Sequence, residues 1–201
     1  MFLRWLAFLF LPLILAACGG PAEPVWAPDA VVKQAVYAHA GPPRVTLFTV
    51  VSTRNGSGGH SGLMVNGAER VMFDPAGTFK VPFVPERNDV LFGMTERALA
   101  AYVDYHARPE WKVRVQELDV TEAQAAALLA AVNAYGAVPK AQCSLAITRI
   151  LSGVKGFESV GVGYFPNALA GDFGALSGVR ERLVTDATAD TSHNVVFEPR
   201  R

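Results

Sequence analysis

The segment GGHSGLMVNGAERVMFDPAG, residues 58–77, decides how the centre of this chain folds. Asn66-Gly67 is the strongest short-range signal for a β-hairpin, and strand-forming residues stand on both sides of it. The segment therefore predicts two antiparallel strands. His60 lies at the start of the first predicted strand, and Asp74 lies at the end of the second.

The length of the hairpin loop determines whether these two side chains share a face. If Asn66 and Gly67 alone form the turn, His60 pairs with Phe73 and Asp74 points to the other side, because side chains alternate along a strand. A three-residue loop or a bulge puts His60 opposite Asp74. The pattern brings the two residues close and leaves their hydrogen bond open.

Other strands and helices are predicted on both sides of the hairpin. The run from Val45 to Ser52 and the alternating stretch 111–120 are typical of strands. Thr95 and Thr121 are typical first caps of helices, and the second helix is predicted to stop at Gly136. Further helices are expected at 31–39, from about 140 to 153, and at 165–176, whereas 78–93 and the polar C-terminal end are expected to be irregular. The sequence thus predicts an α+β fold.

The N-terminus has the pattern of an export signal. Residues 1–17 carry one basic residue, Arg4, and an apolar run that is short for a membrane span. The ending LAAC resembles the lipobox of bacterial lipoproteins, which implies cleavage before Cys18 and a diacylglyceryl group on its thiol. An ordinary secretory signal is the alternative. We expect a lipidated tether at 18–30 and a single domain with a polar tail at 31–201.

Composition restricts the possible partners. The chain has 201 residues, and loss of the expected signal leaves 17 basic and 18 acidic residues without a basic stripe, so no nucleic-acid partner is expected. The sequence contains no CxxC, HExxH or phosphate-loop motif, so neither a metal nor another cofactor is expected. The expected partner is the membrane, through lipid on Cys18. Gly19 after that cysteine resembles sorting to the outer membrane, facing the periplasm.

Lipidation of Cys18 leaves Cys143 as the one free thiol. Cys143 opens the predicted helix in KAQCSLAITRIL and shares its apolar, inward face with Ala146, Ile147, Ile150 and Leu151. The N–H groups and dipole at a helix start favour a thiolate, and Lys140 adds positive charge. The alternatives are an inert buried cysteine or a disulfide with Cys18.

His60 is the candidate base for this thiol. It stands where a glycine-rich loop enters a strand, and a general base needs a third group to fix its ring orientation, for which Asp74 is the candidate. His106 shares a helix stripe with Tyr102 and is expected to pack against its neighbours or to lie at the rim of a site.

The quoted hairpin and the segment AQCSLAITRIL resemble the circularly permuted papain-like hydrolases of the NlpC type, which include lecithin-retinol-acyltransferase-like proteins. In this branch the order along the chain is histidine, third residue, cysteine, which matches His60, Asp74 and Cys143. The resemblance covers roughly residues 45–155 and is greatest for bacterial lipoproteins of this kind. The chain has Gln142 where asparagine is commoner, and its third residue is acidic rather than histidine.

The resemblance implies a permuted papain-like fold, with an antiparallel sheet packed against the helix that bears the cysteine. It also implies a cell-envelope cysteine hydrolase, of the amidase, peptidase or acyl hydrolase type, in which Cys143, His60 and Asp74 are catalytic. The expected substrate is a peptide, a glycan or a lipid ester. The alternative is a non-enzymatic envelope lipoprotein that uses the same scaffold to bind peptide or glycan, which Gln142 favours.

Overall fold

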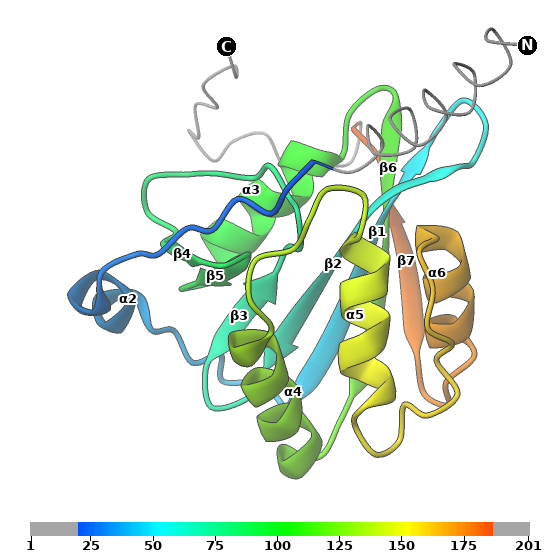
Figure 1. The fold of residues 1–201 in the computed structure, drawn as a ribbon. Coiled ribbons are helices and arrows are strands. Elements are labelled where there is room, and N and C mark those ends of the chain that lie inside the picture. The colour runs from blue at the N-terminus through cyan, green and yellow to red at the C-terminus, as the bar shows by residue number, and fades with distance from the viewer. Residues whose placement is uncertain (1–19, 187–201) are drawn as a thin grey trace, which may run out of the picture.

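The computed structural model describes residues 20–186, which form an α+β fold on one seven-stranded antiparallel sheet (Figure 1). The strand order across the sheet is β4-β5-β3-β2-β1-β6-β7. The strands are β1 (Arg44–Ser52), β2 (Gly58–Asn66), β3 (Arg70–Phe73), β4 (Glu86–Arg87), β5 (Val90–Phe92), β6 (Trp111–Asp119) and β7 (Arg180–Val184). The predicted α+β class and antiparallel sheet are confirmed.

Helices cover both faces of this sheet (Figure 1). They are α2 (Asp29–Ala35), α3 (Glu96–His106), α4 (Glu122–Tyr135), α5 (Cys143–Ser152) and α6 (Pro166–Gly174). Helices α4, α5 and α6 pack on one face, and α3 packs on the other. Between residues 20 and 186, no helix has the length and apolar character needed to cross a membrane.

The central strands are apolar on both faces because helices cover both. Along β1, Leu47 contributes to the core under α4, α5 and α6, whereas the next residue, Phe48, contributes to the core under α3. Along β2, Leu63 and Met64 divide in the same way. This alternation fixes the register, since a shift by one residue would exchange the two cores.

The hairpin of β2 and β3 has a three-residue loop, because Asn66 pairs with Arg70. Continuing this register by one pair beyond Leu63 and Phe73 places Asp74 opposite Gly62. The odd loop therefore puts Asp74 on the face that Gly62 shares with His60. Of the alternatives that the sequence left open, the three-residue loop is the one observed. The expectation that such a loop puts His60 directly opposite Asp74 is wrong, because the residue opposite Asp74 is Gly62.

The capping residues that the sequence predicts lie at the starts of α3 and α4 and at the end of α4. The Thr95 side chain accepts a hydrogen bond from the backbone of α3, and Thr121 forms a capping box with Gln124 at the start of α4. Gly136 follows α4 with a φ of 88°, a conformation that glycine adopts without steric cost.

Three expectations for the irregular parts of the chain are corrected. Residues 78–93 contain β4 and β5, which are too short to show periodicity in the sequence. The polar run 180–184 forms β7, which lies at the edge of the sheet beside β6 and is largely exposed. Helix α2 starts at Asp29, within the expected tether, and ends at Ala35.

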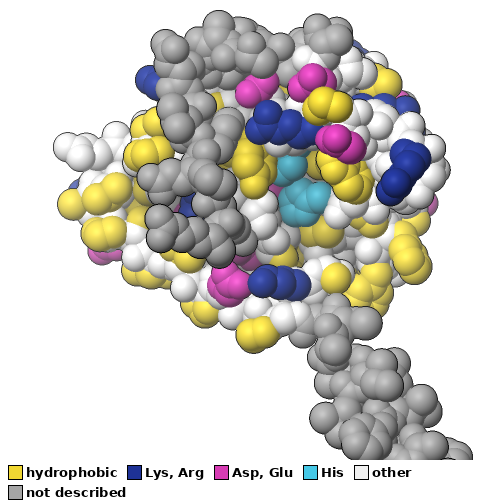
Figure 2. Space-filling view, turned by 90° about the horizontal axis from the view of Figure 1, so that it is seen from above, with side chains coloured by type: hydrophobic (Ala, Val, Ile, Leu, Met, Phe, Trp, Pro, Cys, Tyr) yellow, Lys and Arg dark blue, Asp and Glu magenta, His cyan; other side chains and the backbone are white. Residues whose placement is uncertain are grey.

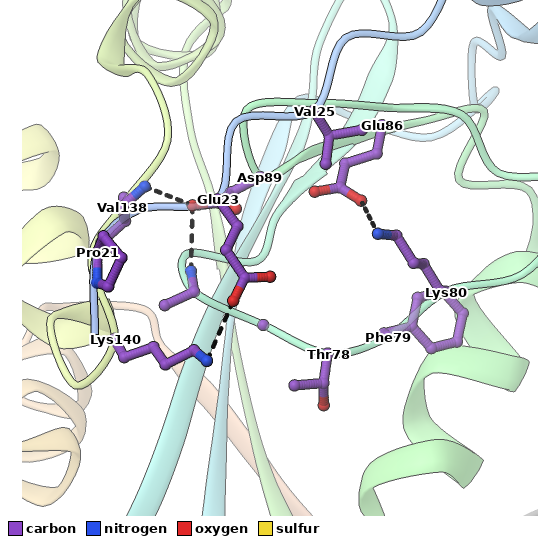
Figure 3. A pocket seen from close by; sticks show the side chains of 12 residues that line it. Pro21, Glu23, Val25, Thr78, Phe79, Lys80, Glu86, Asp89, Val138 and Lys140 are labelled. Carbon is purple, nitrogen blue, oxygen red and sulfur yellow. Dashed lines mark hydrogen bonds and ion pairs between the residues drawn. The ribbon is translucent and has the colours of Figure 1, made fainter. Parts of the chain in front are cut away.

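The beginning of the described chain lies against the body of the protein. The Gly20 carbonyl accepts a hydrogen bond from the backbone N–H of Lys140, and the Ala27 N–H donates to the Glu86 carbonyl. Glu23 forms an ion pair with Lys140 over a small cavity of ≈ 40 Å³ (Figure 3). The expected signal at 1–17, Cys18 and the end of the chain after residue 186 lie outside the described residues.

Candidate active site

His60 lies in a distorted part of β2. Val50 of β1 pairs with His60, but Val51 pairs with Gly58, so Gly59 is an extra residue in a β-bulge. Bulges redirect neighbouring side chains and are frequent beside active sites. The pairing of β2 with β3 has ended before His60 is reached, so the imidazole ring lies at the open end of the hairpin.

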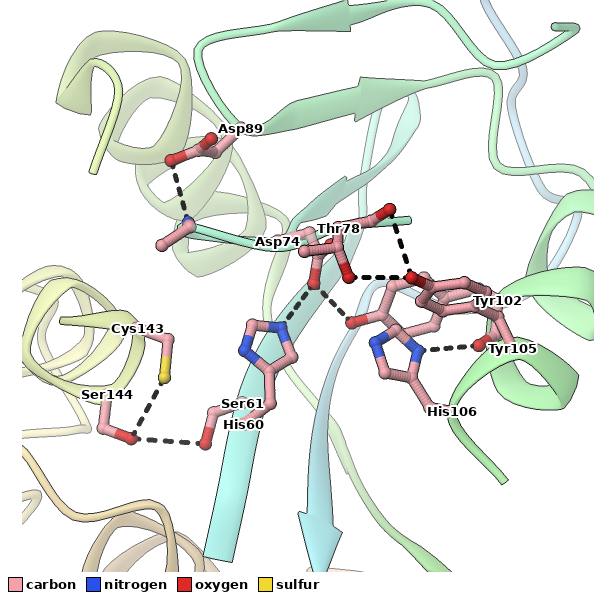
Figure 4. A network of polar contacts seen from close by, with 11 residues as sticks. His60, Ser61, Asp74, Thr78, Asp89, Tyr102, Tyr105, His106, Cys143 and Ser144 are labelled. Carbon is pink, nitrogen blue, oxygen red and sulfur yellow. Dashed lines mark hydrogen bonds and ion pairs between the residues drawn. The ribbon is translucent and has the colours of Figure 1, made fainter. Parts of the chain in front are cut away.

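A buried carboxylate holds the His60 ring. Asp74 Oδ1 lies 2.7 Å from His60 Nε2 and also accepts a hydrogen bond of 2.7 Å from the hydroxyl of Tyr102 on α3 (Figure 4). A Cβ atom at Gly62 would lie 2.2 Å from that hydroxyl oxygen, so this network requires glycine there. The hydrogen bond between Asp74 and a ring nitrogen of His60, which the sequence left open, is therefore formed.

Cys143 is the first residue of α5 and is buried, as are Ala146, Ile147 and Ile150 on the same helix face. Its predicted place on the inward face is therefore confirmed. Within residues 20–186, no side chain caps the N-terminus of this helix, in contrast to α3 and α4. The first N–H groups of a helix have no partner within the helix, so at α5 they are available to an anion.

The thiol of Cys143 and the ring of His60 face each other at this end of the sheet (Figure 4). Since Asp74 occupies Nε2, Nδ1 is the nitrogen left for the thiol. The hydroxyl of Ser144 lies 4.0 Å from the sulfur and 3.3 Å from the hydroxyl of Ser61 on β2. The structure thus brings together all three residues that the sequence singles out.

The electrostatics favour an ion pair of thiolate and imidazolium. Burial lowers the pKa of His60, but the charge and hydrogen bond of Asp74, with a contribution from Cys143, outweigh burial and raise this pKa to about 10. Burial raises the pKa of Cys143, but the hydrogen bond and charge of His60 and the N–H of Ser61 outweigh it and lower this pKa. Burial also raises the pKa of Asp74, and the charge of His60 brings it below its ordinary value.

His106 lies beside the site rather than simply in the core. Its ring stacks on that of His60, with centroids 5.6 Å apart, and its Nδ1 donates a 2.8 Å hydrogen bond to the Tyr102 carbonyl. Burial lowers the pKa of His106 to about 4, so this ring is neutral near neutral pH. The expectation that His106 packs against its neighbours or lies at the rim of the site is therefore confirmed.

The same residues form a possible metal-ligand group. His60, Asp74 and His106 each offer one ligand atom, and these atoms lie within 4.8 Å of one another. Two of them, on His60 and Asp74, already form the 2.7 Å hydrogen bond with each other. A metal ion here would have to displace that bond, whereas the bond itself fits the orientation of a catalytic histidine.

Sequence reasoning missed three residues that touch the site. Ser61 and Ser144 directly follow His60 and Cys143, but serine at those places has no recognisable pattern. Tyr102 stands one helical turn before His106, so it shares a face with that histidine, yet the sequence does not show that this face meets Asp74.

Compared with protein-family models, with curated proteins and with solved structures, the chain has no significant match to any of them.

Proposed function

We propose that this chain is a cysteine hydrolase that cleaves an amide or ester bond through a covalent thioester. The observation that carries the proposal is the buried Asp74–His60 pair, whose second ring nitrogen faces Cys143 at an uncapped helix N-terminus. A nucleophile, a base and a residue that orients the base are the three parts that this chemistry needs.

In the first half of the reaction the Cys143 thiolate attacks the substrate carbonyl, and a C–S bond forms. The carbonyl oxygen becomes an oxyanion, which the N–H groups at the start of α5 stabilise. The oxyanion then collapses, the C–N or C–O bond breaks, and protonated His60 gives its Nδ1 proton to the departing amine or alcohol. The products are a thioester on Cys143 and a neutral His60 ring.

In the second half a water molecule attacks the thioester carbonyl while His60 Nδ1 takes its proton. The C–S bond breaks, the acid product leaves, and the thiolate and imidazolium return. Asp74 stays ionised throughout and holds the ring by its bond to Nε2, and Tyr102 holds Asp74. Both Asp74 and Tyr102 are positioning residues in this scheme.

We further propose a permuted papain-like architecture, because His60, Asp74 and Cys143 follow one another in the order expected for that family and α5 packs on the sheet. Export, lipid on Cys18 and an outer-membrane location facing the periplasm are part of the same proposal. They rest on residues 1–19 of the sequence alone. Incorporation of labelled palmitate that disappears in Cys18→Ala tests the anchor.

Covalent labelling tests the nucleophile. The mature chain with Cys18→Ala keeps Cys143 as its one thiol, so an acyl-directed thiol probe should label it rapidly at neutral pH. Adding Cys143→Ala should abolish the label, and the same Cys18→Ala chain unfolded in urea, where the His60 contact is lost, should react slowly. Equal rates for the folded and unfolded chains would contradict a catalytic thiol and favour a scaffold that only binds peptide or glycan.

A further inference from the structure

A hollow opens beside His60. Its volume is ≈ 330 Å³, which is within the range of roughly 300–1,000 Å³ for small-molecule pockets. Seen from above, the histidine side chains lie at the floor of a depression bordered by hydrophobic side chains (Figure 2). The residues that line it are Val50, Gly59, His60, Tyr105, His106, Arg108 and Trp111.

The bulge in β2 builds one wall of this hollow. A Cβ atom at Gly59 would lie 2.6 Å from the ring of Trp111, the first residue of β6. The extra glycine therefore lets the indole close against the backbone just before His60. Tyr105 and His106, from the end of α3, supply the opposite aromatic wall, with their rings 5.0 Å apart. The pocket is thus formed by the same irregularity that positions the candidate base.

The charged side chains that line the hollow are positive. Arg108 is permanently positive, and His60 is the protonated partner of the thiolate in the scheme above. Among residues 20–186, those that line the hollow include no carboxylate, and Asp74 behind the ring already accepts hydrogen bonds from His60 and Tyr102. A cationic group would therefore meet the positive charges of Arg108 and His60, whereas apolar surface would meet aromatic walls.

The position of the hollow indicates which half of the substrate it holds. His60 lines it and Cys143 does not. In the proposed reaction the acyl carbon binds to the sulfur, and the departing group must lie against the histidine that protonates it. A pocket on the histidine side is therefore on the leaving-group side of the scissile bond.

We propose that this hollow binds the leaving group, and that the group is an uncharged amine or alcohol with an apolar or aromatic body. This inference rests on the proposed hydrolase function and deepens it. It favours substrates such as esters or amides of bulky apolar alcohols and amines over substrates whose leaving group carries a positive charge.

Binding can be tested without catalysis. In the mature chain the tryptophans are Trp26 and Trp111, so Trp26→Phe leaves an indole only in the wall of the hollow. With Cys18→Ala and Cys143→Ala added, titration with cyclohexylmethanol should shift the Trp111 emission to the blue. Cyclohexylmethylammonium, the isosteric cation, should bind at least about tenfold more weakly. Equal shifts with both ligands, or none with the alcohol, would overturn the pocket assignment.

Turnover tests the same idea with the active chain. The value of kcat/KM for cyclohexylmethyl acetate should exceed that for methyl acetate by at least about tenfold, and Trp111→Ala should bring the ratio close to one. Trp26→Ala, a tryptophan outside the hollow, should keep the ratio. Hydrolysis of both esters at the same rate would refute the assignment of the hollow to the leaving group, but it would not contradict the proposed hydrolase function. Thiol-independent hydrolysis, unchanged in Cys143→Ala, refutes the hydrolase.

Discussion

His60 Nε2 lies 2.7 Å from Asp74 Oδ1, although β3 ends before Asp74 and the two residues are not paired across the hairpin. The contact is diagonal, because Asp74 stands opposite Gly62, which shares its face with His60. The missing side chain of Gly62 leaves room for the Tyr102 hydroxyl to reach the same carboxylate oxygen. One buried oxygen therefore fixes a histidine from β2 and a tyrosine from α3.

The charge of His60 controls the acidity of Cys143. His60→Ala removes the positive partner and leaves burial, which raises the thiol pKa. Alkylation of Cys143 by iodoacetamide at neutral pH should then slow by about tenfold for each unit by which the pKa rises. The measurement is the alkylation rate as a function of pH in Cys18→Ala chains. His39→Ala, which changes a partly exposed histidine paired with Glu96, should leave the profile unchanged. An unchanged profile in His60→Ala would contradict the ion pair.

Gly62→Ala should disrupt the hydrogen bond between Tyr102 and Asp74 by steric overlap. The new Cβ atom would lie 2.2 Å from the Tyr102 hydroxyl oxygen, so Tyr102 must move off Asp74. Overpacking of this kind costs about 1–3 kcal/mol, and we also expect slower labelling of Cys143 because the His60 ring loses its orientation. Urea unfolding and thiol labelling measure the two effects. Gly171→Ala on α6 meets no atom within 4 Å and is the matched control. Equal behaviour of the two variants would refute the steric argument.

Asp89 ties two parts of the site together. Its Oδ2 accepts hydrogen bonds from the N–H of Ala76, 3.1 Å away, and from that of Val138, 2.8 Å away (Figure 3). Ala76 follows Asp74, and Val138 precedes the helix of Cys143. Asp89→Ala leaves both N–H groups unsatisfied, at about 1–3 kcal/mol for each, and should slow thiol labelling.

Asp89→Asn is the control for that variant. Asparagine keeps an oxygen acceptor at the same place and tolerates the φ of 68° at this position. The free energy of unfolding of Asp89→Asn should therefore stay close to that of the wild type. Similar losses in both variants would show that the charge of Asp89 matters, rather than the two hydrogen bonds.

Below pH 6.5, the ordinary pKa of histidine, stability should fall on acidification, and His106 contributes to the fall. Burial lowers its folded pKa to about 4 from an ordinary value of 6.5. Between these values the unfolded chain binds a proton that the folded chain does not, so stability is lost as the pH falls through this window. Asp74 acts in the same direction, because its folded pKa is lowered as well. One such proton gives a slope of at most about 1.4 kcal/mol per pH unit.

His106→Phe should flatten this acid limb while keeping an aromatic ring beside His60. The check is the urea midpoint measured at several pH values for both chains. Asp74 titrates in both chains, so only the difference between their pH dependences of the urea midpoint is due to His106. An acid limb of the same steepness in the two chains would mean that His106 is protonated in the folded protein.

The sequence by itself determined the parts that depend on neighbouring residues. The hairpin at Asn66-Gly67, the caps at Thr95 and Thr121 and the stop at Gly136 follow from local turn and capping chemistry. The inward face of α5 follows from helical periodicity, and with it the burial of Cys143. These features could be predicted because their energetics act within a few residues of chain.

Only the tertiary structure decided how distant residues meet. The three-residue loop and the bulge at Gly59 set the faces of Asp74 and His60, and a local pattern does not choose between loops that differ by one residue. Tyr102 meets Asp74 because α3 packs on the face of the sheet that α5 leaves free. Neighbouring strands offer the hydrogen bonds that form the short strands β4 and β5 and the edge strand β7. The residues of these three strands have no periodicity of their own that predicts a strand.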